Sequence, residues 1–376
     1  MSGGAARCRV VAVESTSQRR AFIEFPYRHY ASDPHFVPPL RRDEHRRFEP
    51  RHNPFLDHAG MRLWLALDGE RVVGRVAAID DRLHNEVHRE QVTWFGFFEA
   101  TTADVARALL AAVEAHAAVC GSTAVRGPVN PSLHEAAGLL VEGFDDDPYA
   151  LMSYNPRSYP AFIEGAGYGR VKDLFAWDLD VRAPLPERLT RIAGRVRDRY
   201  GITIRPVNLK RFDEELEILK VIYRAAWSDN WGFVPPTDAE IRQLAIDLKP
   251  VADPELVLFA EMRGEPVACA VSIPDVNQVL KRMRGDLLPF GVVHFLRRRR
   301  IIDRARMLLL GVMPEARRLG LYPLLIAEAL TRAAARGYQR GEVGWTLEDN
   351  RLINAGIEAA GGRRSKIYRL YEKPVG

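Results

Sequence analysis

The sequence has few cysteines and no long apolar run. Its 376 residues include three cysteines, Cys8, Cys120 and Cys269, which lie far apart and form no CxxC pair. Disulfide frameworks and structural zinc sites need closely or regularly spaced cysteines, so we expect free thiols in a reducing compartment. No stretch approaches the roughly 20 apolar residues needed to cross a bilayer, and the first residues lack the charged-then-apolar order of a signal peptide. We therefore expect a cytoplasmic protein.

Metal-binding motifs are missing as well. None of the 10 histidines belongs to an HExxH motif or a His/Cys cluster. His84 and His88 have i,i+4 spacing, but no carboxylate pattern accompanies them, and we expect both on the surface. Because zinc sites are built from such clusters, the sequence predicts no metal ion.

The composition is that of an ordinary soluble globular protein. With 47% hydrophobic and 27% charged residues, the chain does not fit a disordered, collagen-like or coiled-coil class. A length of 376 residues predicts two or three domains. Nothing in the sequence specifies an oligomeric state.

Positive charge is concentrated in one segment. The net charge is +5, yet residues 281–306 alone hold nine basic and two acidic residues, so the rest of the chain is slightly acidic. A nucleic-acid-binding domain spreads basic residues over a whole face, so this pattern does not favour a nucleic-acid partner. In this segment arginines alternate with apolar residues, which suits an anionic membrane interface, and a peripheral protein on the inner membrane face is one expectation. A solvated flap is the alternative.

An internal repeat divides the chain. Residues 62–80 and 256–275 both read as β-hairpins, and their turn glycines are 195 positions apart. A second block repeats at the same separation, with Asn155 matching Asn350. Two independent matches at one separation indicate a duplication.

Each half also contains a strand, an alanine-rich helix and another strand, with the helices at 103–119 and 322–336. The order predicts two α/β domains with mixed sheets, 1–183 and 184–376, separated by a proline-containing segment. The second domain carries a basic insert at 276–303.

The second half contains an anion-binding pattern. A short loop at 314–322 separates an apolar strand from a helix that we expect to begin at Pro323. Free backbone N–H groups at a helix N-terminus attract anions; here Arg317 and Arg318 add charge, and Gly320 allows close approach of a ligand. No Gly-Lys-Ser/Thr is present, so a pyrophosphate without a metal fits better than a nucleoside triphosphate with magnesium.

The pattern V-x-P-x-x-R-x-x-G, formed by Val312, Pro314, Arg317 and Gly320, resembles the acyl-CoA motif of the GNAT acyltransferase superfamily. The resemblance implies two GNAT-like acyl-CoA N-acyltransferase domains in tandem, with acyl-CoA as co-substrate. It implies that the loop holds the CoA pyrophosphate and that the preceding strand pairs with pantetheine. The positions implied in acyl-CoA binding are Leu310, Val312, Arg317, Arg318, Leu319, Gly320, Leu321, Tyr322 and Asn350.

Three features depart from that family. Tyr322 stands where the motif has a small residue, and Ile357 stands where many members carry a tyrosine general acid. If an acid is needed, Tyr368 and Tyr371 on the last strand are the candidates. The first half has no R-x-x-G loop, so we expect no CoA site there.

Candidates for the general base are carboxylates. Glu348 and Asp349 follow the strand that lies beside the CoA-pairing strand in the GNAT layout. The alternative is helix capping by Asp349 or Asn350, which precede a helix expected near Arg351. The first-half insert at 129–150 reads as a polar loop whose Glu142 or Asp145 could reach the amine. A solvated surface loop is the alternative there.

The leading functional hypothesis is an acyl-CoA-dependent N-acyltransferase with a small-molecule or lipid amine as acceptor. Residues 25–40 and the segments GPVNPS and LLVEGFD resemble a group of bacterial tandem-GNAT proteins that includes ceramide synthases, which implies a sphingoid base as acceptor. Two alternatives stay open: a Fem-type tRNA-dependent aminoacyl transferase, and a non-catalytic acyl-CoA sensor.

Overall fold

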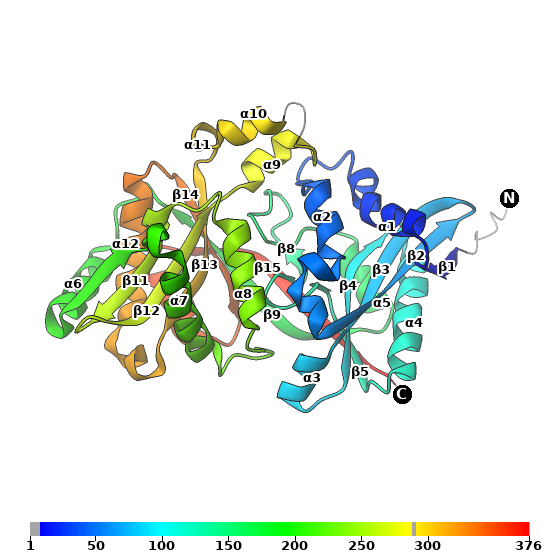
Figure 1. The fold of residues 1–376 in the computed structure, drawn as a ribbon, viewed down its shortest axis with the longest axis horizontal. Coiled ribbons are helices and arrows are strands. Elements are labelled where there is room, and N and C mark those ends of the chain that lie inside the picture. The colour runs from blue at the N-terminus through cyan, green and yellow to red at the C-terminus, as the bar shows by residue number, and fades with distance from the viewer. Residues whose placement is uncertain (1–7, 288–290, 376) are drawn as a thin grey trace. The chain divides into compact units, whose positions relative to one another are not determined.

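The computed structural model describes residues 8–287 and 291–375 (Figure 1). It confirms the expected mixed α/β fold. The chain folds into two compact units. Unit 1 comprises Met1–Asp173, Met283–Gly291 and Tyr368–Gly376, and unit 2 comprises Leu174–Arg282 and Val292–Ile367.

The sheet of unit 1 has the order β1-β2-β3-β4-β5-β15, in which only β4 and β5 are parallel. Its strands are β1 (Arg9–Ala12), β2 (Ala59–Asp68), β3 (Arg71–Asp81), β4 (Val92–Ala100), β5 (Ala124–Gly127) and the end of β15 (Arg363–Pro374). The helices of this unit are α1 (Thr16–His29), α2 (Arg41–Arg47), α3 (Arg82–His88), α4 (Ala103–Val119) and α5 (Tyr159–Gly165), with short 3-10 helices at Pro50–His52 and Pro54–Asp57. The apolar face of α4 packs on β2, β3 and β4 and forms the core of the unit.

The sheet of unit 2 repeats the arrangement with the order β10-β11-β12-β13-β14-β9, in which only β13 and β14 are parallel. Its strands are β9 (Gly169–Asp180, from Leu174 on), β10 (Ile202–Pro206), β11 (Val257–Met262), β12 (Glu265–Pro274), β13 (Arg304–Val312) and β14 (Arg340–Leu347). The helices are α6 (Glu187–Tyr200), α7 (Phe212–Trp227), α8 (Asp238–Leu248), α9 (Asn277–Met283), α10 (Gly291–Leu296), α11 (Arg298–Ile301), α12 (Leu321–Ala335) and α13 (Arg351–Ala359), with 3-10 helices at Leu209–Arg211, Pro254–Leu256 and Pro314–Leu319.

Each unit is completed by a strand from the other half of the sequence. In unit 1, β5 pairs with the C-terminal strand β15 through Tyr371↔Gly127. In unit 2, β14 pairs with β9 from the first half through Arg340↔Asp180. The compact units are therefore not the two sequence halves, and the division at 183/184 stays a prediction about the duplication.

Both predicted hairpins are present, as β2–β3 and β11–β12. The insert at 129–150 is not the loop that its polarity predicts. Instead, it forms the small sheet β6 (Val129–Asn130) with β7 (Ala136–Ala137), followed by β8 (Leu139–Glu142), which pairs with β15. Its apolar residues, spaced between the polar ones, enter the core: Leu139, Leu140 and Tyr149 are buried. In the basic insert 276–303, the apolar residues Leu288 and Phe290 lie outside the described residues.

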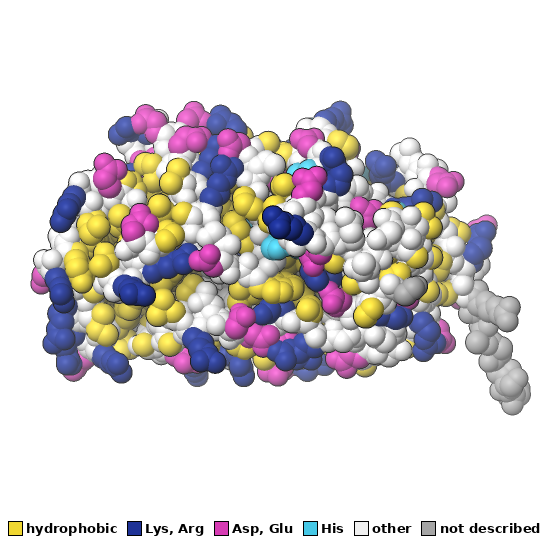
Figure 2. Space-filling view, turned by 90° about the horizontal axis from the view of Figure 1, so that it is seen from below, with side chains coloured by type: hydrophobic (Ala, Val, Ile, Leu, Met, Phe, Trp, Pro, Cys, Tyr) yellow, Lys and Arg dark blue, Asp and Glu magenta, His cyan; other side chains and the backbone are white. Residues whose placement is uncertain are grey.

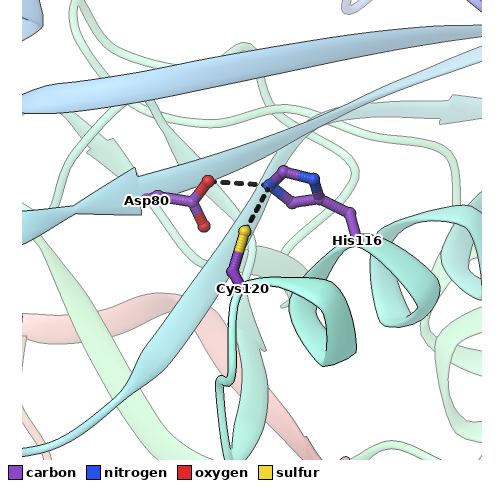
Figure 3. A group of neighbouring side chains, drawn as sticks. All are labelled: Asp80, His116 and Cys120. Carbon is purple, nitrogen blue, oxygen red and sulfur yellow. Dashed lines mark hydrogen bonds and ion pairs between the residues drawn. The ribbon is translucent and has the colours of Figure 1, made fainter.

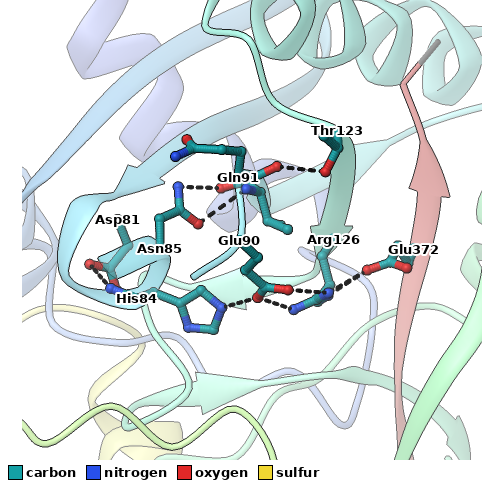
Figure 4. Close-up of polar contacts among 9 residues, drawn as sticks. Asp81, His84, Asn85, Glu90, Gln91, Thr123, Arg126 and Glu372 are labelled. Carbon is teal, nitrogen blue, oxygen red and sulfur yellow. Dashed lines mark hydrogen bonds and ion pairs between the residues drawn. The ribbon is translucent and has the colours of Figure 1, made fainter. Parts of the chain in front are cut away.

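A polar network ties α3 and β5 to β15 in unit 1 (Figure 4). The carboxylate of Glu90 accepts hydrogen bonds from Arg126 at 2.8 Å and 3.2 Å, and Arg126 also donates to Glu372 at 2.6 Å. His84 is buried, contrary to the expectation of a surface residue, because its Nε2 pairs with Glu90 Oε1 at 2.6 Å. Burial lowers the pKa of His84. Burial alone would raise the pKa of Glu90, but hydrogen bonds from Arg126 and His84 hold this pKa below its usual value.

The face drawn in Figure 2 carries basic and acidic side chains interspersed with apolar ones. This mixture fits the nearly balanced charge outside residues 281–306. Within residues 8–287 and 291–375, no helix is both long and apolar enough to span a bilayer.

Candidate functional site

The two parallel strands of unit 2 separate partway along their length. Among the described residues, the ladder between β13 and β14 runs from Arg304↔Arg340 to Met307↔Val343. Beyond Met307, β13 continues to Val312 while still paired with β12. The end of β13 therefore has one strand edge that β14 no longer covers.

Two backbone N–H groups of β13 point toward this uncovered edge, as the direction of a neighbouring N–H shows. The N–H of Met313 points the other way and donates to the carbonyl of Val267 on β12 at 2.9 Å. Because successive backbone N–H groups of a strand point to opposite edges, those of Leu310 and Val312 point toward the side of β14. These two residues are among the predicted acyl-CoA positions, and their N–H groups are placed to bond an extended amide-containing ligand.

The helix after β13 begins beside this edge. It starts at Leu321, two residues earlier than the proline signal predicts, and Pro323 is its third residue. The loop itself is a 3-10 helix, Pro314–Leu319. Gly320 at the N-cap has φ +82°, a left-handed conformation that favours glycine, and it has no side chain to cap the first-turn N–H groups. The positive end of a 15-residue helix is thereby left available to an anion.

The two arginines of the loop have different environments. Arg317 reaches back to the end of α7: its Nη2 donates to the carbonyl of Ala226 at 3.2 Å, and its Nη1 donates to Asp229 at 2.7 Å. Arg318 is exposed and lies one residue nearer the helix start. The motif arginine thus secures the loop, whereas the guanidinium of Arg318 is accessible from solvent.

The residues that depart from the GNAT pattern are packed into the core of unit 2. Tyr322 and Ile357 both belong to the core cluster, together with Leu321, and Leu319 packs against it. Burial raises the pKa of the Tyr322 hydroxyl, and the charge of Arg317 partly offsets this. Ile357 has a hydrocarbon side chain without an acidic proton and is fully buried, so its position supplies packing.

The predicted carboxylates follow β14 in a turn. Glu348 is partly buried and Asp349 is exposed. The helix cap is Asn350 rather than Asp349, because Asn350 Oδ1 accepts from the N–H of Ile353 at 3.3 Å. The side chain of Asn350 is thus engaged in capping α13, which leaves Glu348 and Asp349 as the carboxylates of this turn.

The remaining candidates belong to unit 1. Tyr368 on β15 is fully buried, and Glu142 at the end of β8 is exposed. Asp145 is exposed and pairs with Arg157. The hydroxyl of Tyr371 donates to Glu164 at 3.1 Å, which gives this tyrosine a structural role.

In unit 1, the opening between the parallel strands is filled by the chain itself. The β4–β5 ladder runs from Val92↔Ala124 to Trp94↔Arg126. Beyond it, the side-chain oxygen of Asn130 on β6 accepts from the N–H of Phe97 on β4 at 2.5 Å. A Cβ at Gly96 would lie 1.7 Å from the carbonyl oxygen of Val129, so strand β6 packs tightly on β4.

The first helix after β4 also differs from its counterpart in unit 2. Helix α4 is capped by Thr102, whose hydroxyl accepts from the N–H of Val105 at 3.3 Å. The helix N-terminus thus has a side-chain cap, where α12 has a glycine. Both features support the expectation that the first domain has no CoA site.

Sequence reasoning missed buried charged groups in both units. In unit 1, Glu99 Oε2 accepts from the hydroxyls of Tyr30 at 2.5 Å and Tyr159 at 2.9 Å, and burial raises the pKa of Glu99. In unit 2, Glu342 is 1% exposed and lies 3.8 Å from Arg306, where β13 and β14 still pair. The available signal was a charged residue inside an otherwise apolar strand.

Comparisons with known proteins agree with this fold. The chain is similar to a tandem GNAT protein from the clavulanic acid biosynthesis pathway, with 13% identity and a TM-score of 0.59 over 98% of this chain and 99% of the other. That likeness shows a tandem GNAT fold. No protein-family model matches the chain.

Two curated proteins are similar over nearly the full length. Protein YghO of Escherichia coli (strain K12) is 35% identical over 366 residues, which cover 95% of this chain and 93% of YghO. The bacterial ceramide synthase of Caulobacter vibrioides (strain NA1000 / CB15N) is 37% identical over 376 residues, which cover 97% of each protein. At this level of identity over this length, the chain belongs to the same protein family as the Caulobacter bacterial ceramide synthase.

Proposed function

We propose that this protein is an acyl-CoA-dependent N-acyltransferase whose acceptor is a lipid amine of the sphingoid-base class. The observation that carries the proposal is the full-length relationship to a bacterial ceramide synthase, at 37% identity. The uncovered edge of β13 and the glycine-capped start of α12 support it, because together they suit an extended thioester ligand that ends in a pyrophosphate.

The acyl-CoA lies along unit 2 in this proposal. The pantetheine amides bond the backbone of Leu310 and Val312, in place of the β14 rungs that end at Val343. The pyrophosphate sits at the first turn of α12, where Leu321 and Tyr322 offer backbone N–H groups, and Arg318 adds a charge-assisted hydrogen bond.

The reaction is a direct transfer. The neutral amine attacks the thioester carbonyl carbon, a C–N bond forms, and the C–S bond breaks. CoA leaves as a thiolate and takes up a proton, while the amine nitrogen gives one up, so amide and CoA thiol are the products. A backbone N–H of β13 stabilises the oxyanion.

Glu348 is the proposed general base, because it is the partly buried carboxylate of the turn that follows β14. Asp349 is its exposed neighbour, and Glu142 is the alternative base from unit 1. Tyr368 is the proposed proton donor to the thiolate.

A lipid acceptor implies contact with a membrane, and we assign this contact to residues 291–302. Leu296 is 72% exposed and Val293 is 43% exposed, so α10 presents apolar side chains to solvent. Arg297, Arg299 and Arg300 follow them and are exposed too. Exposed apolar and cationic side chains on one short segment suit an anionic bilayer surface, and we infer a cytoplasmic protein that binds the inner membrane face peripherally.

Purified protein tests the proposal directly. Incubation with a long-chain acyl-CoA and sphinganine in mixed micelles should release free CoA thiol, and mass spectrometry should identify the N-acylated product. Water-soluble amines serve as the comparison. Tight acyl-CoA binding without thiol release on any amine would favour the sensor alternative, and tRNA-dependent product formation would favour the Fem-type alternative.

A further inference from the structure

Three side chains, one from β3 and two from the end of α4, meet in unit 1 (Figure 3). Asp80 lies near the end of β3, His116 lies in the last turn of α4, and Cys120 is the C-cap residue of α4. His116 Nε2 is 2.7 Å from Asp80 Oδ2 and 3.5 Å from Cys120 Sγ. Both partners therefore converge on one ring nitrogen, and the three ligand atoms lie within 4.8 Å of one another.

The spacing of these atoms suits a tetrahedral metal ion. With Zn–S near 2.3 Å and Zn–N near 2.0 Å, two ligands of a tetrahedral zinc ion are separated by about 3.5 Å. The observed separation of Cys120 Sγ and His116 Nε2 is 3.5 Å. The Asp80–His116 separation of 2.7 Å is that of a hydrogen bond, and it would have to widen by roughly 0.6 Å around an ion.

The surroundings of the cluster orient its ligands. Thr93 on β4 donates its hydroxyl proton to Asp80 Oδ1 at 2.8 Å, which leaves Oδ2 directed at His116. Thr93 is fully buried and also contacts the hydroxyl of Ser122 at 2.8 Å. Such outer hydrogen bonds to a ligating carboxylate are typical of metal sites.

The cluster also offers access and suitable chemistry. Cys120 is exposed while His116 and Asp80 are partly buried, so an ion can enter from solvent and keep a water ligand.

We propose that Asp80, His116 and Cys120 bind one divalent ion of the zinc class, with water as the fourth ligand. The ion links the end of α4 to β3 and stabilises unit 1. The proposal does not depend on the acyl-transfer function, and its test does not use activity.

The test uses the purified full-length chain, stripped of metal and kept reduced by a phosphine. Titration with Zn²⁺ against a chromophoric chelator should give one site per chain, and Co²⁺ should produce thiolate-to-cobalt charge-transfer absorption. Cys120→Ser, His116→Ala and Asp80→Asn should each weaken binding by more than about 100-fold, and Thr93→Val by roughly 10- to 100-fold. Zn²⁺ should raise the melting temperature of the native chain but not of these variants.

Cys8→Ser is the matched control, since Cys8 is the other partly accessible thiol of unit 1. It should bind Zn²⁺ as the native chain does. Native binding no tighter than that of the three ligand variants, or an equal loss in Cys8→Ser, would overturn the proposal. If the ligand variants fail to fold, an absent charge-transfer band in the native cobalt-loaded chain overturns it by itself.

Discussion

The guanidinium of Arg317 donates to the carboxylate of Asp229 across 2.7 Å, joining the loop after β13 to the residues that follow α7. The same guanidinium donates to the carbonyls of Ala225 and Ala226 in the last turn of α7. The arginine of the V-x-P-x-x-R-x-x-G pattern is therefore a positioning residue in this structure. We therefore expect substitution of Arg317 to affect stability and substitution of Arg318 to affect acyl-CoA binding.

Arg318→Ala should weaken acyl-CoA binding by roughly 10- to 100-fold, the effect of losing a charge-assisted hydrogen bond to phosphate, and should leave the melting temperature unchanged. Arg317→Ala should lower the melting temperature, because the carbonyls at the end of α7 lose their donor. Calorimetric titration and thermal melts measure the two effects. Arg363→Ala, another exposed arginine of unit 2, is the control and should change neither. Intact affinity in Arg318→Ala would remove Arg318 from the site.

Gly320→Ala tests the close approach at the start of α12. The left-handed φ of +82° costs a non-glycine residue about 1 kcal/mol, and the added methyl group also stands beside the proposed pyrophosphate position. Gly337→Ala is a matched control, because Gly337 has φ +89° with open space around its Cβ position. Denaturant unfolding should show at least as large a loss of stability in Gly320→Ala as in Gly337→Ala, because a Cβ at Gly320 would also lie 3.2 Å from Val196 Cγ2. Only Gly320→Ala should lose acyl-CoA affinity. Equal affinities for the two would argue against a ligand at this loop.

Glu348→Gln should lower turnover by about 10²- to 10⁴-fold with acyl-CoA affinity nearly unchanged, as expected for a general base. Glu142→Gln is the parallel variant, and whichever of the two shows the loss identifies the base. Asn350→Ala should instead lower the free energy of unfolding by about 1 kcal/mol, because α13 loses its side-chain cap. Turnover assays and urea unfolding distinguish the two kinds of effect. Full activity in both glutamine variants would leave the base outside this pair.

The exposed arginines of the 291–302 segment should control membrane binding. Replacing Arg297, Arg299 and Arg300 with glutamine removes three charges at on the order of 1 kcal/mol each near an anionic surface. Vesicle sedimentation should show the native chain bound at low salt and the variant in the supernatant.

The control replaces Arg188, Arg191 and Arg195 of α6, which are also exposed, and should still sediment. Arg298 is kept in both, since its guanidinium lies 4.6 Å above the Phe295 ring. Release of both variants would point to net charge rather than to this segment.

The buried carboxyl of Glu99 should make stability depend on pH. Burial raises its pKa in the folded chain above the unfolded value, so the folded state binds this proton more tightly. Protonation of Glu99 therefore favours the folded state. This contribution to the free energy of unfolding is fully present below the unfolded pKa, at about pH 4, and is lost as the pH rises through the folded pKa. Glu99→Gln should therefore gain stability relative to the native chain between about pH 4 and pH 7, as measured by urea unfolding at both values. A difference that does not change with pH would contradict the raised pKa.

Several elements of this protein follow from local sequence. The hairpins β2–β3 and β11–β12, the strands beside α4 and α12, and the loop before α12 all depend on short-range signals such as turn glycines, alternation and helix propensity. The start of α12 is displaced by only two residues from the proline signal, because Gly320 rather than Pro323 sets the N-cap. Local rules predict an acyl-CoA loop at 314–322 for the same reason, since its motif is contiguous.

The tertiary structure decided what depends on long-range pairing. Each half of the sequence ends in a strand, β9 in the first half and β15 in the second. The structure exchanges them: β15 pairs with β5 in unit 1, and β9 pairs with β14 in unit 2. Strand pairing depends on which edges meet in space, and the order along the chain does not determine this. The contacts of Arg317 with α7, the burial of Leu139, Leu140 and Tyr149, and the contact of Asp80 with His116 were likewise decided by the tertiary structure. Each depends on a contact between residues distant in sequence, whose geometry no local pattern encodes.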